Sequence, residues 1–154
     1  GEMKMQKLLK AGVVAVLLTL FGGTNVYAAD KGPTVSDAHE LLGDYIEHGS
    51  VTNGPDTWSN YSGNGCVSSV GWVSSEYVVK IDWSGITSVV RESDNQSGVA
   101  VWGVIVVSGA DGKKILTPKS ANFLVPDAVS AKRIEKAMTL LMNSCASKLR
   151  SKFD

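Results

Sequence analysis

The chain has 154 residues, with 15 basic and 15 acidic side chains and therefore a formal net charge of zero at pH 7. This balance gives no general reason to expect a nucleic acid or an anionic membrane as a partner, because such partners select for an excess of basic side chains. A chain of this length can bury a hydrophobic core without a structural metal.

Residues 1–28 have the order of a cleavable secretory signal peptide. A lysine-rich start precedes an almost unbroken apolar run over residues 11–21. Glycines then interrupt the run, and residues 26–28 (Val-Tyr-Ala) place small or tolerated side chains where signal peptidase reads them. We expect cleavage after Ala28, with Ala29 as the alternative.

The predicted signal peptide indicates the compartment in which the protein works. Gly1 and Glu2 precede Met3 and are interpreted as added residues or as a misplaced start. The apolar run is shorter than the roughly 20 residues that span a bilayer, so no membrane span is predicted. We therefore predict export to a bacterial periplasm or to the extracellular space, with residues 29–154 forming a single domain.

Cys66 and Cys145 are the only two cysteines of the chain. In an oxidising compartment, an isolated pair within one domain is most simply a structural disulfide. The two residues are too far apart for a C-x-x-C redox motif, and no clustered histidines accompany them to form a zinc site. Free thiols or redox chemistry are the alternatives.

Residues 35–48 have the periodicity of an amphipathic helix. Ser36 is the predicted N-cap, with Asp37 in the first turn, where the helix dipole favours an acidic side chain. The apolar positions fall on a single face; they are Ala38, Leu41, Leu42, Tyr45 and Ile46.

Both histidines of the chain, His39 and His48, stand in this helix. A zinc-binding helix of the His-Glu-x-x-His type needs a second histidine at the position that Gly43 occupies. The remaining polar side chains are interpreted as solvated charges and not as a cation site; they are Glu40, Asp44, Glu47 and His48. We expect no metal and no cofactor.

Residues 49–65 are rich in Gly, Ser, Asn, Pro and Asp, which predicts a loop or an irregular edge strand. Trp58 and Tyr61 stand out in this polar segment. Exposed aromatic side chains in a loop are common binding anchors, so both residues are candidates for contact with a partner. The alternative is that Trp58 closes the end of a barrel.

The segment from residue 66 to residue 107 has the pattern of short strands. Residues 76–83 alternate between apolar and polar, which places Trp83 in the core. Ser84 and Gly85 predict a turn, and a polar turn is predicted at 92–98. Residues 99–107 are apolar on both faces, which predicts a central strand covered on both sides, with Trp102 in the core.

The last part of the chain predicts a hairpin turn at 110–112, strands at 113–117 and 122–125, and a closing helix capped by Asp127. The apolar positions of this helix, including Cys145, recur at helical spacing. Its basic residues are either a solvated face or a basic docking surface; the candidates are Lys132, Arg133 and Lys136.

The order of helix, strands and helix predicts an α+β domain, in which a bent antiparallel sheet or small, partly open barrel is capped by the C-terminal helix. The segments EYVVKIDW, SGITSV, DGKK and SAKRIEKAMTLLMNSC resemble pleckstrin-homology-type domains over residues 65–147. The chain is also similar to small exported bacterial proteins of unknown function. The first hairpin of the resemblance has no basic residue before Lys80, so phosphoinositide binding is not expected.

No pattern of a hydrolase, a phosphate-binding loop or a carboxylate pair stands out in the chain. We therefore predict a non-enzymatic binding protein that recognises another protein, as an inhibitor, an immunity protein or an envelope accessory factor would. The alternative is a carrier of a small apolar ligand or lipid, held between the sheet and the C-terminal helix beside Met138 and Met142.

Overall fold

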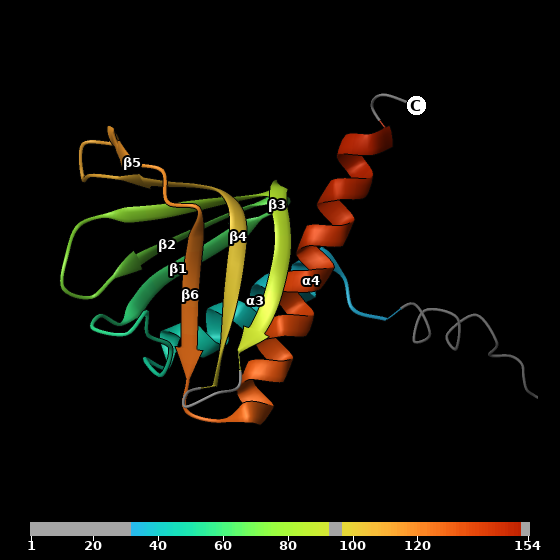
Figure 1. The fold of residues 1–154 in the computed structure, drawn as a ribbon, viewed down its shortest axis with the longest axis horizontal. Helices are drawn as coiled ribbons and strands as arrows, with labels where there is room; N and C mark the ends of the chain where they lie inside the picture. The colour runs from blue at the N-terminus through green and yellow to red at the C-terminus, as the bar shows by residue number, and fades with distance from the viewer. Residues whose placement is uncertain (1–31, 93–96, 152–154) are drawn as a thin grey trace, which may run out of the picture. The chain divides into compact units, whose positions relative to one another are not determined.

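The structure is a computed structural model that describes residues 32–92 and 97–151 (Figure 1). The predicted signal peptide lies outside the described residues, as does most of the polar turn predicted at 92–98. All the helices and strands described below belong to one compact unit that begins at Thr34.

The fold class is α+β, as predicted: an N-terminal helix, a curled antiparallel half-barrel and a C-terminal helix (Figure 1). The elements in chain order are α3 (Val35–Glu47), β1 (Trp58–Asn64), β2 (Val67–Trp72), β3 (Val78–Glu92), β4 (Ser97–Ser108), β5 (Lys114–Leu116), β6 (Ser120–Val125) and α4 (Ala128–Ser151).

The described strands form a six-stranded sheet in the order β1-β2-β3-β4-β5, and β6 pairs with the first half of β4. The long hairpin of β3 and β4 runs from the pair Val78 and Ser108 to the pair Glu92 and Gly98. The turn predicted at Ser84 and Gly85 is wrong, because β3 continues through both residues. The pairing is only irregular there.

A close approach of two backbones causes this irregularity. Gly103 of β4 has a φ of 146°, and a Cβ at this position would lie 2.4 Å from the carbonyl oxygen of Gly85. Only glycine fits such a conformation and such a contact. The local break in pairing lets the hairpin bend, and the bend curls the sheet into a half-barrel.

Residues between α3 and β1 close the curl on one side. Thr52 and Leu124 exchange backbone hydrogen bonds of 2.9 and 2.7 Å, which joins this segment to β6. The Nε1 of Trp58 in β1 donates a bond of 2.8 Å to the carbonyl oxygen of Asn122 in β6. The first and last strands are therefore held together although they are not neighbours in the sheet.

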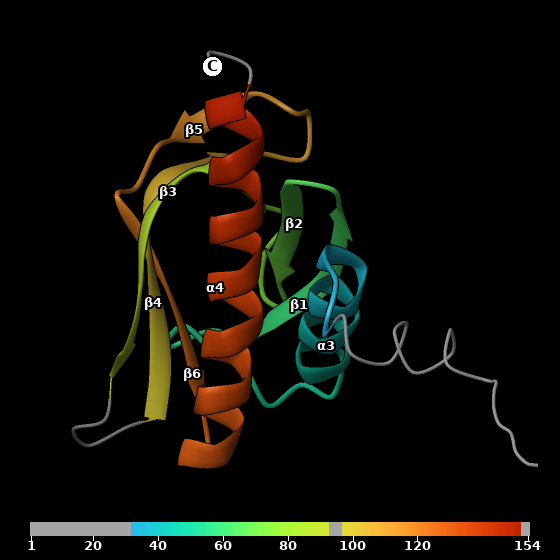
Figure 2. The same cartoon turned by 90° about the vertical axis from the view of Figure 1, so that its right-hand side faces the viewer.

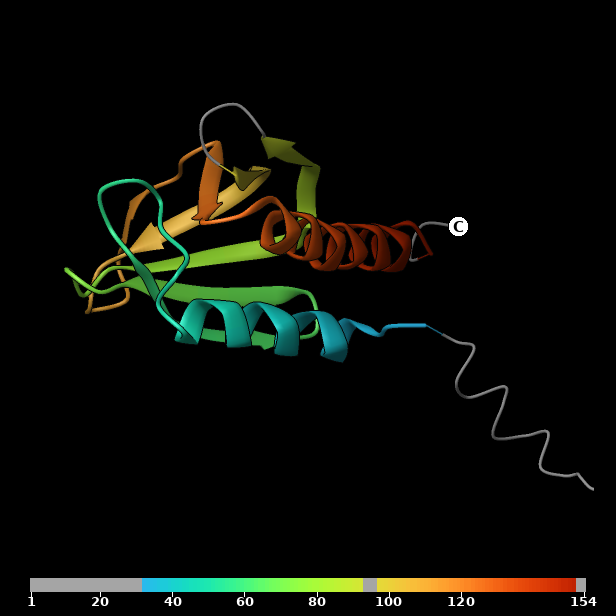
Figure 3. The ribbon, with the colours of Figure 1, turned by 90° about the horizontal axis from the view of Figure 1, so that it is seen from below.

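Both helices pack on the concave side of the sheet. Figure 2 shows α4 across the opening of the half-barrel, and Figure 3 shows α3 beside the first strands. Buried residues of both helices share one hydrophobic core with strand residues such as Val79, Ile81 and Trp83. Arg91 Nε of β3 lies 3.4 Å from Glu135 Oε1 of α4, on the exposed side of this contact.

The start of α3 differs from the prediction. Thr34 is the N-cap, not Ser36: its Oγ1 accepts from Asp37 N at 3.1 Å, while Asp37 Oδ2 accepts from Thr34 N at 2.8 Å. This reciprocal capping box satisfies two backbone donors, whereas a cap at Ser36 would satisfy fewer.

The start of α4 follows the prediction. Asp127 Oδ1 accepts from Ser130 N at 2.7 Å. The hydrogen bonds from the backbone and the side chain of Ser130 hold the pKa of the Asp127 carboxyl below its usual range. The predicted cap is therefore confirmed.

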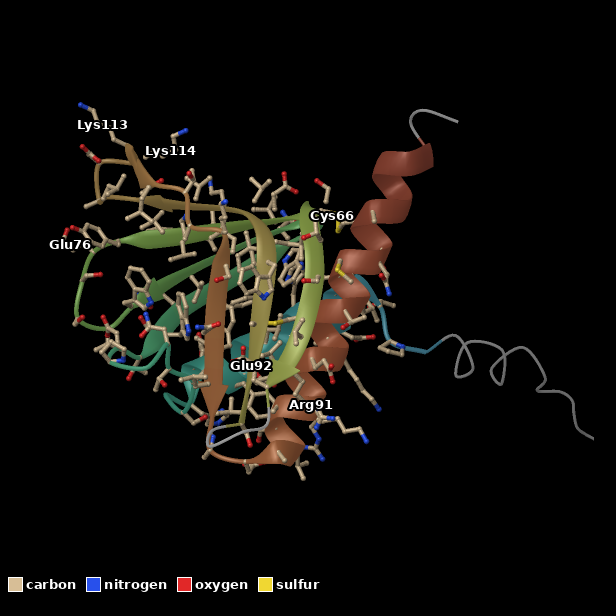
Figure 4. All side chains as sticks on the ribbon, viewed as in Figure 1. Cys66, Glu76, Arg91, Glu92, Lys113 and Lys114 are labelled. Atoms are coloured by element: carbon tan, nitrogen blue, oxygen red, sulfur yellow. A yellow bond between two sulfur atoms is a disulfide. The ribbon has the colours of Figure 1, made fainter. Side chains whose placement is uncertain are left out.

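The predicted disulfide between Cys66 and Cys145 is present. Cys66 lies in the tight connection between β1 and β2, and Cys145 is a fully buried residue of α4. The bond ties the first hairpin to the last helix (Figure 4). None of the described helices is long and apolar enough to cross a membrane.

Candidate functional site

Trp58 is buried, with 2% of its surface exposed. Its ring stacks on that of Phe123 at a centroid distance of 4.7 Å, and its Nε1 is already bonded to Asn122. Of the two roles considered for Trp58, closing the end of a barrel agrees with this position. An exposed anchor does not.

Tyr61 is half-buried within a chain of hydrogen bonds that joins α3 to three strands. His39 Nε2 donates to the carbonyl oxygen of Gly65 at 2.8 Å, so in the neutral ring Nδ1 accepts from the Tyr61 hydroxyl, also at 2.8 Å. Ser68 Oγ lies 2.8 Å from the Tyr61 oxygen and accepts a 2.8 Å bond from Trp83 Nε1. Every polar side chain of this group therefore has a partner.

Burial dominates the chemistry of Tyr61. It raises the pKa of Tyr61 from 10.0 to about 12, and the hydrogen bond with Ser68 offsets part of the rise. A phenol with so high a pKa stays neutral at physiological pH. Its role here is to connect His39 with Ser68.

His39 is one of two buried polar residues in the described part of the chain, the other being Ser68, and neither was predicted to lie in the core. Its exposed fraction is 8%, and a Cβ on the facing Gly63 would lie 1.9 Å from its Nδ1. The spacing of His39 from Leu42 and Ile46 follows the buried face of α3 and could have indicated this position. Because both ring nitrogens are engaged within the fold, His39 is not available as a general base.

The basic candidates of α4 lie within its first half. Lys132, Arg133 and Lys136 are all exposed. Arg133 lines a groove of about 430 Å³ between α4 and α3, and the other charged residues of that groove are acidic; the described lining consists of Asp37, Glu40, Leu41, Asp44, Tyr45, His48 and Arg133. The charge of this groove does not favour an acidic partner. Within the described ranges, no three His, Cys, Asp or Glu side chains lie close enough together to hold a metal ion.

The convex face of the sheet exposes apolar side chains. Trp102 is 44% and Val104 is 57% exposed, so the prediction that Trp102 lies in the core is wrong. The same strand buries Val99 and Val101 on its concave side. The prediction that this strand is covered on both sides holds for its first part, where Gly98 to Val101 are all buried, and is wrong at Trp102 and Val104.

Other apolar residues share this face with Trp102. Trp102 pairs with Ser88, and Val90 two residues further on β3 is 45% exposed. Alternation along β2 and β3 adds Val67 and Val78, which are also exposed. Lys80 and Asp82, which follow Val78 on the same face of β3, separate Val78 from Val104, and Val67 pairs with Asp82. We call the remaining group the convex patch; it consists of Val90, Trp102 and Val104.

Comparison of the chain with protein-family models, with curated proteins and with solved structures finds no match. The resemblance to pleckstrin-homology-type domains therefore stays a prediction.

Proposed function

We propose that the protein is an exported, non-enzymatic binding protein that recognises another protein through the convex patch. The observation that carries this proposal is the exposure of Trp102 and Val104 on a sheet face that no described helix covers. Tryptophan is enriched among the residues that dominate protein–protein binding energies, where it fills a desolvated pocket of the partner. The expected partner surface is therefore apolar, with a pocket that accepts an indole ring.

The pattern of β4 supports this proposal. Apolar residues occupy both faces of the strand, which is typical of a strand covered on both sides. The two described helices, α3 and α4, cover the concave face, whereas Trp102 and Val104 on the other face are exposed. A partner that packs on the convex patch would supply the second cover.

The surroundings of the convex patch also suit a protein partner. Lys80 and Asp82 are exposed on β3, at positions that alternate with the buried Val79 and Ile81, and serines occupy neighbouring strand positions. An apolar centre with a small polar rim is the usual anatomy of a protein interface. The charges at this rim are of both signs, so the proposal does not depend on strong electrostatic attraction.

Two further features support the other parts of the proposal. The engagement of both His39 ring nitrogens within the fold leaves this buried histidine with a structural role, in keeping with a non-enzymatic protein. The Cys66–Cys145 disulfide is consistent with an exported protein.

The proposal is tested with Trp102→Ser and with Tyr77→Ser as a matched control. Tyr77 is also 44% exposed but lies outside the convex patch, before β3. The immobilised wild type is used to capture partners from an envelope extract, and a captured protein is then purified and titrated against all three chains. We expect Trp102→Ser to weaken binding by about thirtyfold or more, which corresponds to the loss of a hot spot of about 2 kcal/mol, and Tyr77→Ser to bind as the wild type does.

Three results would contradict the proposal. A partner that binds Trp102→Ser and the wild type equally would place the interface elsewhere. Equal losses in both variants would indicate a general effect on the fold, which thermal unfolding of the variants would reveal. A dimer of this chain that depends on Trp102, measured by sedimentation, would show that the face binds a second copy and not another protein.

A further inference from the structure

The second half of β3 is paired on one side only. β2 pairs with β3 from Val78 to Asp82, and one further bond of 2.8 Å joins Trp83 N to the carbonyl oxygen of Cys66. Over residues 86–92, β4 is the only described strand that pairs with β3. In Figure 2, α4 crosses the concave side, and no described element continues the sheet beyond this half of β3. We call the unpaired side of residues 86–92 the free edge.

The bonds of β6 show which way the backbone groups of β4 point. Leu124 N donates to the carbonyl oxygen of Thr52 at 2.7 Å, and Thr52 N donates to that of Leu124 at 2.9 Å, so both groups of Leu124 point away from β4. Gly98 stands opposite Leu124 in β4. Because two residues of such an antiparallel pair direct their groups away from each other, Gly98 directs its own N–H and C=O toward its partner in β3, Glu92.

Two residues of β3 direct their backbone groups to the free edge. The direction alternates along a strand, so the hydrogen-bonded pairs with β4 stand at Glu92, Val90 and Ser88. The N–H and C=O groups of Val89 and Arg91 lie between these pairs and point away from β4. Within the described ranges, no backbone hydrogen bond engages them. Their spacing is that of a strand ladder, so the group that fits them is the backbone of another strand.

The free edge lacks most of the protection that edge strands usually carry. Natural proteins blunt such strands with charged side chains, prolines, bulges or a very short length. Residues 84–90 (Ser-Gly-Ile-Thr-Ser-Val-Val) contain neither a charge nor a proline, and β3 as a whole has 15 residues. An irregularity between Ile86 and Ser88 interrupts the edge, and the charges of Arg91 and Glu92 stand at its end. A long edge with an uncharged centre invites pairing with a strand of another chain.

We propose that the protein partner contributes an extended segment, which pairs with β3 from Ser88 to Arg91 as an additional strand. This inference rests on the proposed function, because it assumes that the convex patch recognises a protein. Outward N–H and C=O groups at alternate residues match the backbone of an extended polypeptide. In this mode of recognition the main-chain bonds supply affinity, and alternate side chains of the added strand supply specificity.

The free edge adjoins the convex patch, which indicates the side chains that the added strand needs. Val90 of the patch lies on β3 itself, and Ser88 stands opposite Trp102. Side chains of the added strand that point to the convex side therefore lie beside Val90 and Ser88, and the small Ser88 leaves space above it toward the Trp102 ring. The expected segment has apolar side chains at alternate positions and no proline at its centre.

The probe for the free edge is a phage-displayed library of random linear peptides of about nine residues, which is long enough for one strand. The library is selected on the immobilised, disulfide-bonded protein, so the test does not require the natural partner. Selected peptides are synthesised and titrated against the wild type and Val89→Pro. Since Val89 N–H points away from β4, proline removes the outward donor without breaking a bond of the β3–β4 ladder. We expect Val89→Pro to weaken binding by about tenfold or more.

Ala128→Pro is the matched control. Ala128 is exposed at the first position of α4, where proline is tolerated, and it belongs neither to the free edge nor to the convex patch. This variant should bind the selected peptides as the wild type does.

Hydrogen exchange of the wild type gives a second readout, which holds if Val89→Pro does not fold. In the free protein, the amides of Val89 and Arg91 should exchange faster than those of Ser88 and Val90, because only the latter two are bonded to β4. A bound peptide should slow the exchange of Val89 and Arg91.

Three results would overturn this inference: a selection that yields no binding peptide, equal binding by Val89→Pro and the wild type, or unchanged exchange of Val89 and Arg91 in the complex. A dimer of the protein that Val89→Pro abolishes would also overturn it, because the edge would then pair with a second copy. The proposed function fails on a different result, equal binding of a captured partner by Trp102→Ser and the wild type. The two failures are therefore distinguishable.

Discussion

The two ends of the concave face differ in whether their buried polar side chains have hydrogen-bond partners. At the closed end, where α3 meets the β1–β2 hairpin, the indole of Trp83, the hydroxyls of Ser68 and Tyr61 and the imidazole of His39 form a complete chain of hydrogen bonds. The Cys66–Cys145 disulfide lies at the same end. At the open end, the indole of Trp72 lines a cavity and its N–H has no partner in the described structure.

The two ends therefore differ in how completely their buried polar groups are paired. A buried polar chain with every member paired specifies one packing arrangement, because any shift leaves a donor or an acceptor unpaired. The facing Gly63 and the side chain of His39 fit together in the same way. At the open end the loops are joined mainly at their tips, where Ser74 Oγ donates to Asp56 Oδ2, and the pKa of Asp56 is held below its usual range chiefly by that bond.

Removal of the disulfide is the largest expected disturbance of the closed end. The bond joins residues separated by 79 positions. A Cys66→Ala, Cys145→Ala double variant should lower the free energy of unfolding by about 2–5 kcal/mol, because the unfolded chain regains the entropy that the crosslink removes. Urea unfolding of the variant, with the reduced wild type as a second case, measures this loss. A change below about 1 kcal/mol would mean that the stability of the closed end does not depend on the disulfide.

High pH should disturb the closed end through Tyr61. The folded pKa of about 12 lies above the ordinary value of 10.0, so the unfolded chain loses this proton first as the pH rises. The contribution of Tyr61 is therefore complete below pH 10 and is lost between pH 10 and 12, by about 2–3 kcal/mol in total. Urea unfolding from pH 9 to 11.5 should show a steeper decline for the wild type than for Tyr61→Phe. Parallel declines would contradict the burial of this phenol.

Replacement of a single hydrogen-bonding side chain should change the free energy of unfolding least, but it should show the clearest difference between the two ends. Ser68→Ala removes the partner of Trp83 Nε1 and should cost about 1–3 kcal/mol of unfolding free energy, because a buried donor is left unpaired. Trp72→Phe breaks no hydrogen bond to a described residue and should cost less than about 1 kcal/mol. Thermal and urea unfolding measure both.

Ser69→Ala is the control for this contrast. Ser69 follows Ser68 in β2 and alternates to the other face of the strand, so its replacement should change the unfolding free energy by less than about 0.5 kcal/mol. If Ser68→Ala and Trp72→Phe lowered the free energy of unfolding equally, the two ends would not differ in the hydrogen-bond pairing of their buried groups.

Local pattern was sufficient for the helices, most strands and the disulfide. The apolar spacing of α4 is set by the 3.6-residue turn, so it placed Cys145 on the buried face before any contact was known. The alternation around Trp83 placed that side chain in the core in the same way. The cap at Asp127 and the turn at residues 110–112 depend on neighbouring residues alone, and both occur.

Only the tertiary structure decided which tryptophans are buried and which are free to bind. Trp58, in a polar segment, is covered because β1 meets β6, while Trp102, in the most apolar strand, is exposed because both described helices pack on the other face. Hydrophobicity along a strand does not tell which of its two faces a distant element will cover. The pairing of His39 with Tyr61 and the unpaired N–H of Trp72 likewise depend on segments that are distant in sequence. The sequence by itself therefore determined the helices, most strands and the disulfide, whereas the packing of distant segments determined the candidate sites.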